Sequence, residues 1–99
     1  MPRPTNLTVD GRVVAVLTAT GGDFPWQHGT YEPGPDVALV ASAFVDLPDG
    51  RRDLDLDRLA AAGHDLGSVR LDDGDHLHAL VVAPDGSAAW RSGFEPLEP

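Results

Sequence analysis

The sequence predicts an α+β domain in which an antiparallel sheet of about five strands carries one or two short helices, inserted in the middle of the chain. Two observations carry this prediction. Turn-forming residues recur between short apolar runs, as is typical of strands joined by hairpins. The middle of the chain holds an alanine-rich stretch flanked by helix-capping residues. The chain of 99 residues fits a single domain, 1–99, that can bury one hydrophobic core.

An N-terminal hairpin is predicted by Asp10 and Gly11. The pair stands between the apolar runs 7–9 and 12–20, and an Asp-Gly turn accepts the positive φ angles that a tight hairpin requires. The second run is apolar at consecutive positions, so we expect an interior strand covered on both faces and ended by the glycines at 21–22.

The segment 24–35 is predicted to be a loop with a short extended piece at 27–32. Three aromatic residues and three prolines crowd into it, and prolines exclude a helix and limit ladder pairing. Large aromatic residues with a polar atom are enriched at binding hot spots. The predicted partner-binding residues are therefore Trp26, Gln27, His28 and Tyr31. The alternative is that the aromatic residues plug one end of the core.

A first helix is predicted from Asp36, as N-cap, to about Asp46. The same residues, 37–47, also alternate in a way that suits a strand, and this alternative stays open. A turn at 48–50, with the sequence Pro-Asp-Gly, ends the segment.

A second helix is predicted over 56–62. Asp55 is its expected N-cap and Gly63 its expected end. Leu54 before the cap and Leu59 inside the helix fit a hydrophobic staple.

The last third of the chain predicts a three-stranded meander near 69–71, 76–83 and 88–92. Turns at 73–74 and 84–86 join its strands. The middle strand is apolar on both faces, so we expect it to lie in the interior of the sheet.

The pair His76 and His78 is the candidate metal site. Alternate residues of a strand share a face, and two imidazoles at that spacing can begin a zinc, nickel or iron site. Such a site needs further ligands, for which His28, His64 and the carboxylates at 72–75 are available. The alternative is that both histidines lie at the rim of the sheet.

Other catalytic and binding signatures do not appear. Cysteine is absent, which excludes disulfides and thiolate ligands. The acidic turn at 71–75 lacks the ligand spacing of an EF-hand, and the serines stand outside a nucleophile elbow. The glycines at 21–22 lack the companions of a phosphate-binding loop. No cofactor is predicted, and the chain is more consistent with a binding protein than with an enzyme.

The charge balance narrows the class of partner. Sixteen acidic residues face seven arginines, and the net charge is −9. This charge disfavours nucleic acid and anionic membranes and leaves a basic protein as a favoured partner. Long apolar stretches are missing, so we expect a cytoplasmic protein.

Several short motifs resemble a group of small uncharacterised bacterial proteins. The resemblance rests on the Asp-Phe-Pro-Trp of 23–26, the Gly-Thr-Tyr-Glu-Pro-Gly-Pro of 29–35, the His-Ala-Leu of 78–80 and the Ala-Trp-Arg of 89–91. It covers about half the chain and departs from the group at 37–47, where a more charged helix is expected. It implies no activity, ligand or catalytic residue.

We therefore expect a non-enzymatic cytoplasmic protein-binding module of the inhibitor, immunity or accessory type. The first alternative is a metal-binding protein or metal-dependent enzyme centred on His76 and His78. The second is a structural subunit that associates with itself, which exposure of Val40 or Phe44 would favour.

Overall fold

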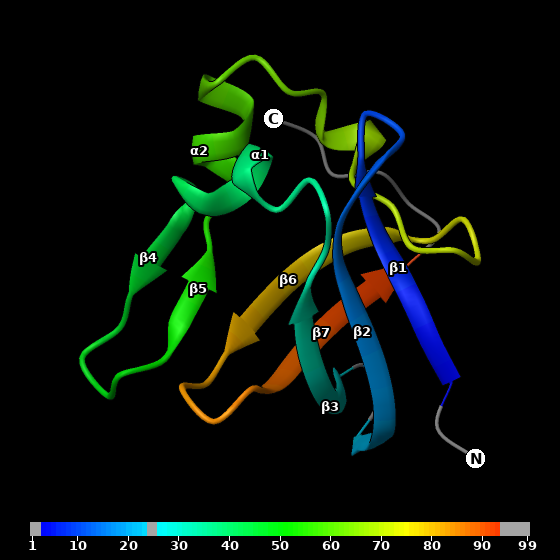
Figure 1. Ribbon diagram of the computed structural model, residues 1–99, viewed down its shortest axis with the longest axis vertical. Coiled ribbons are helices and arrows are strands. Elements are labelled where there is room, and N and C mark those ends of the chain that lie inside the picture. The colour runs from blue at the N-terminus through cyan, green and yellow to red at the C-terminus, as the bar shows by residue number, and fades with distance from the viewer. Residues whose placement is uncertain (1–2, 24–25, 94–99) are drawn as a thin grey trace.

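The computed structural model describes residues 3–23 and 26–93, and its sheet dominates the molecule (Figure 1). The elements in chain order are β1 (Arg3–Val9), β2 (Arg12–Asp23), β3 (Trp26–Pro33), α1 (Ala38–Ala41), β4 (Phe44–Asp46), β5 (Arg52–Leu54), α2 (Leu56–Ala61), the 3-10 turn η1 (Leu66–Ser68), β6 (His76–Val82) and β7 (Ser87–Gly93). The seven strands form one antiparallel sheet in the order β1-β2-β3-β7-β6-β5-β4.

The sheet consists of two meanders that meet through their last strands. β1, β2 and β3 follow one another along the chain, as do β4, β5, β6 and β7. The meanders join where β3 pairs with β7, from Trp26 opposite Arg91 to Thr30 opposite Ser87. Residues far apart in the sequence therefore form the centre of the sheet.

The segment that follows η1 curls the sheet by linking β1 to β6. Arg70 forms single antiparallel bridges to Thr8 of β1 and to His76 of β6. The amide of Thr8 donates to the carbonyl of Arg70 at 2.8 Å, and the amide of Arg70 donates back at 3.0 Å. β1 and β6, which are not adjacent in the sheet order, are therefore both bridged to Arg70.

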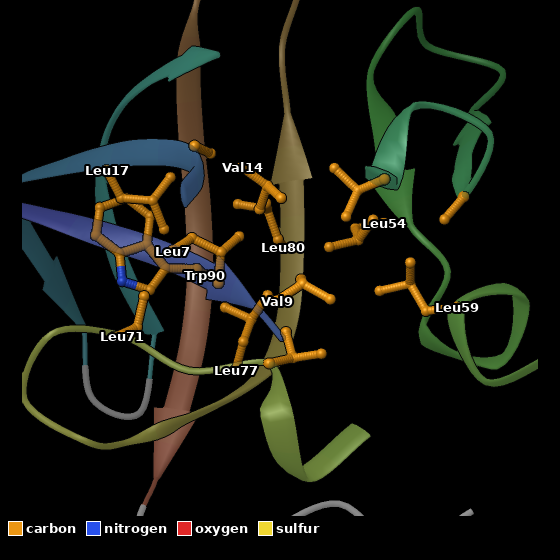
Figure 2. Packing of buried hydrophobic residues seen from close by; sticks show 14 of the residues in the cluster. Leu7, Val9, Val14, Leu17, Leu54, Leu59, Leu71, Leu77, Leu80 and Trp90 are labelled. Atoms are coloured by element: carbon orange, nitrogen blue, oxygen red, sulfur yellow. The ribbon is translucent and has the colours of Figure 1, made fainter. Parts of the chain in front are cut away.

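The hydrophobic core lies on the inner face of the curled sheet, beneath the helices (Figure 2). Trp90, Leu17 and Leu80 are at most 1% exposed. Val40 of α1 and Leu59 of α2 are buried in the same cluster, so both short helices cover the inner face. The two helices gain most of their stability from this packing, because helices of four and six residues are too short to be stable in isolation.

The predicted fold class is confirmed as an α+β arrangement with an antiparallel sheet and two short helices, but the sheet has seven strands. The N-terminal hairpin is confirmed, since Asp10 has a φ of 54° and Gly11 of 80°. β2 is an interior strand of the sheet, as predicted, but it is not buried on both faces, because Val16 and Thr18 are only half-buried. It also continues to Asp23 through a bulge instead of ending at 21–22. β6 is also interior, between β5 and β7.

The extended piece predicted at 27–32 is confirmed and is one residue longer at each end, because Trp26–Pro33 is the strand β3. The loop prediction is therefore wrong at 26 and 33. Positions 24–25 lie outside the described residues. Within β3 the only proline is the last residue, so the ladder loses no amide in its interior. Gly29 lets β2 approach, since a Cβ there would overlap the carbonyl of Thr18.

The segment 37–47 realises both of its predicted alternatives. A helix forms over Ala38–Ala41 only, and it follows Val37 without a side-chain cap, so the predicted cap at Asp36 is wrong. Phe44–Asp46 then pairs with β5. The turn at 48–50 closes this hairpin, with the amide of Leu47 donating to the carbonyl of Arg51 at 2.7 Å. Pairing with β5 therefore overrides helix propensity.

The second helix follows its local signals. The Asp55 carboxylate accepts hydrogen bonds from the amides of Asp57 and Arg58. The helix ends at Ala61, and Gly63 follows with a φ of 97°. The strand predicted at 69–71 is wrong, because only Arg70 forms bridges. β5, which the sequence did not predict, pairs with the far end of β6 instead.

Candidate functional site

The outer face of the sheet carries the candidate site. Side chains alternate between the faces of a strand, so the neighbours of the buried Trp90, Leu80 and Val82 point away from the core. We define the outer face by these side chains: Trp26, His28 and Thr30 of β3, Ser87, Ala89 and Arg91 of β7, Ala79 and Val81 of β6, and Asp53 of β5.

The register arranges the outer face in rows across the strands. Trp26 lies opposite Arg91, which lies opposite Ala79. In the next row His28 is followed by Ala89, Val81 and Asp53. The centre of the face therefore has small apolar side chains, with polar or aromatic groups on the flanking strands.

A hollow of about 380 Å³ opens on this face. Its volume lies within the range of small binding pockets. Small residues form much of its floor because they leave space above the backbone. The hollow is lined by Thr20, His28, Gly29, Arg51, Val81, Ala83, Ser87, Ala88 and Ala89.

Most polar groups at the rim of the hollow already have partners. Arg51 Nε donates to Asp49 at 2.6 Å, and Ser87 Oγ donates to Asp85 at 2.6 Å. Thr20 Oγ1 donates to the carbonyl of His28 at 3.3 Å. By contrast, the exposed imidazole of His28 makes no hydrogen bond or ion pair with another residue of the described ranges. It is therefore available to a ligand or a partner.

Trp26 marks one side of the outer face. The guanidinium carbon of Arg91 lies 5.8 Å from the centroid of its ring, within the range of a cation–π contact. The contact holds the indole, which is half-buried, beside the row of small residues. A large, oriented apolar surface results.

The four predicted partner-binding residues lie on two faces of β3. Trp26 and His28 belong to the outer face, whereas Tyr31 packs against the core cluster. The Tyr31 ring meets Phe44 edge to face at 6.1 Å, and burial raises the pKa of its hydroxyl. Gln27 is exposed and alternates with Trp26. The structure thus brings together two of the four.

The predicted metal pair occupies an irregular part of β6. The register passes from Leu77 to Ala79 with His78 as an extra residue, and this bulge breaks the alternation on which a shared face depends. His76 is 7% exposed, and its Nδ1 has no hydrogen-bond partner. The ring of His78 lies where a Cβ of residue 93 would stand. Within residues 3–23 and 26–93, no three potential ligands gather around one point.

Two electrostatic features were not predicted from the sequence. His64 Nδ1 lies 2.9 Å from Asp10 Oδ2, and the hydrogen bonds from His64 and Ser68 lower the pKa of Asp10. On the outer face, burial and the nearby Asp55 charge raise the pKa of Asp53. Asp53 was missed because its strand is only three residues long and depends on partners distant in sequence.

A comparison with protein-family models, with curated proteins and with solved structures finds no match. The resemblance to small bacterial proteins therefore stays a prediction. No helix among the described residues is long and apolar enough to cross a membrane.

Proposed function

We propose that this protein is a non-enzymatic protein-binding domain and that the outer face is its contact surface. The observation that carries the proposal is that other parts of the described chain bury the inner face of the sheet but leave the outer face partly exposed. Helices and large side chains fill the inner face, whereas the described chain leaves Val81 and Ala89 only half-buried on the outer face. A partly apolar, uncovered surface with a polar rim is typical of interaction sites.

Trp26 and the hollow supply complementary parts of such a contact. A tryptophan at the side of an apolar surface can anchor a partner, and the hollow accepts a side chain in return. The carboxylates at 53, 55 and 57 lie beside the outer face and line a second hollow of about 200 Å³. These charges favour a partner segment with basic residues close to its apolar contact.

Self-association was the second alternative, and exposure of Val40 or Phe44 would favour it. The two side chains differ in how far they are exposed. Val40 is only 1% exposed and supports no association. Phe44 is half-buried, with Tyr31 against one edge and the guanidinium of Arg52 5.0 Å from its centroid. If the chain associates with itself, the outer face is the better surface.

The experiment compares affinity capture from cell extract by three immobilised proteins. These are the unmodified chain, Ala89→Glu in the middle of the outer face, and Ala38→Glu as a matched control at an exposed position of α1. We expect a partner whose capture falls at least about tenfold with Ala89→Glu, because a charge placed in an apolar contact must be desolvated. The control should capture it normally. Equal capture by all three proteins would contradict the proposal.

A further inference from the structure

Two ionisable side chains on the outer face have no partner within the described chain. The imidazole of His28 and the carboxylate of Asp53 make no hydrogen bond or ion pair with other described residues. They stand at opposite ends of one row, with Ala89 and Val81 between them. The row therefore runs from a hydrogen-bond donor, across two small apolar residues, to an anion.

This order is complementary to itself under a two-fold rotation. Consider an axis parallel to the strands, lying above the sheet between β7 and β6. Rotation about it brings a second sheet face to face and reverses the order of the row. His28 of each copy then faces Asp53 of the other, and Ala89 faces Val81. An isologous interface requires this kind of self-complementarity.

We propose that the outer face binds a second copy of this chain, in a two-fold dimer that pairs His28 of each copy with Asp53 of the other. This inference rests on the proposed function, because it names the partner of the same surface. Sheets pack face to face about 10 Å apart with their strands nearly aligned. The small residues in the middle of the row permit that approach.

The outer face carries charges of both signs, which permits a second copy there. Each copy carries a net charge of −9, so two copies repel over most of their surfaces. On the outer face Arg91 of β7 accompanies the carboxylate of Asp53, whereas Arg51 at the rim of the hollow is already paired with Asp49. Asp53 is partly desolvated and lies near the negative Asp55. A donor from a second copy would offset both of these costs.

The size of the face indicates a weak dimer. The four strands that carry the outer face, at about 4.8 Å spacing, span about 14 Å from the first to the last, which corresponds to the lower end of specific interfaces. We therefore expect dissociation constants from about 1 μM to about 100 μM. The mass of the purified 99-residue chain should be measured by sedimentation equilibrium over that concentration range.

Charge reversal tests the pairing itself. Asp53→Arg places a cation opposite His28, and His28→Glu places an anion opposite Asp53, so each single variant should weaken the dimer at least about tenfold. The double variant His28→Glu with Asp53→Arg restores an opposite pair, and it should return the dissociation constant to within about threefold of the original. Ala38→Glu should leave the dimer unchanged. Thermal melting verifies that each variant is folded, and Ala89→Glu replaces any variant that is not.

The outcomes separate this inference from the proposed function. A chain that stays monomeric throughout the range overturns the dimer, while capture that depends on Ala89 would still support a different protein partner. A dimer that none of the variants changes also overturns the inference, because it must use another surface. If Ala89→Glu affects neither capture nor association, both proposals fail together.

Discussion

The two tryptophans occupy neighbouring strands and opposite faces of the same sheet. Trp90 of β7 lies opposite Gln27 and is 1% exposed, in the middle of the core. Trp26 of β3 lies opposite Arg91, one position further along the ladder, and is half-buried on the outer face. A shift of one residue thus turns a core residue into a surface residue, because side chains alternate along a strand. The inner face stabilises the fold, and the outer face is the proposed contact surface.

Replacing each tryptophan by alanine should produce the largest contrast. Trp90→Ala removes the largest buried side chain and should cost about 3–5 kcal/mol of the free energy of unfolding. Trp26→Ala removes the contact with Arg91 and should cost about 1 kcal/mol or less. Urea denaturation of both variants measures these losses. Similar costs for the two variants would refute the division between a stabilising and a binding face.

A smaller effect is expected at the start of α2, which brings Leu59 to the inner face. Asp55→Ala removes the side chain that accepts hydrogen bonds from two backbone amides and should cost about 1 kcal/mol. Asp55→Asn keeps an acceptor, so it should retain most of that stability. Equal losses for both substitutions would show that the charge, and not the cap, is what matters at this position.

The smallest effect concerns the hydrogen bond between Asp10 and His64, outside both faces. The folded state lowers the pKa of Asp10 below its ordinary value of 3.8. The carboxylate therefore stabilises the folded state at pH values above 3.8, and this contribution is lost as the pH falls through the lower folded-state pKa. Asp10→Asn should thus lower the Tm at pH 7 and have less effect at about pH 2.5.

The matched control for this prediction is Asp46→Asn. Asp46 is exposed and forms no ion pair within the described ranges. Its replacement should change the Tm less at pH 7 than Asp10→Asn does. A loss of Tm in Asp10→Asn that is the same at both pH values would indicate that the carboxylate charge is not responsible.

Local chemistry predicted those parts of the fold that depend on neighbouring residues. The turn at Asp10 and Gly11 needs only positive φ angles, and the cap at Asp55 needs only the next two amides. β4 lies within the segment 37–47, whose alternation already suited a strand, but β5 was missed because its three residues are too few to display a period. The existence of β5 depends on its pairing with β6, which no local pattern encodes.

The same reasoning limits the prediction of the candidate site. Aromatic content identified Trp26 and His28, but it could not separate them from Tyr31, because the loop prediction assigned no faces. Once β3 is a strand, alternation alone places Tyr31 on the inner side. Asp53 and Ala89 could not be assigned to the site from the sequence, because they are 36 residues apart. Only the sheet order shows that both lie beside Val81 of β6.

The bridge at Arg70 has a consequence for how copies of the chain can add to one another. Exposed strand edges allow open-ended growth into fibrils, and β1 is one edge of this sheet. Arg70 and Asp72 occupy that edge, through hydrogen bonds to Thr8 and Asn6. The opposite edge, β4, is three residues long and ends in Asp46. Short or blocked edges leave little template for further strands, so a dimer formed through the outer face would not extend along its strand edges.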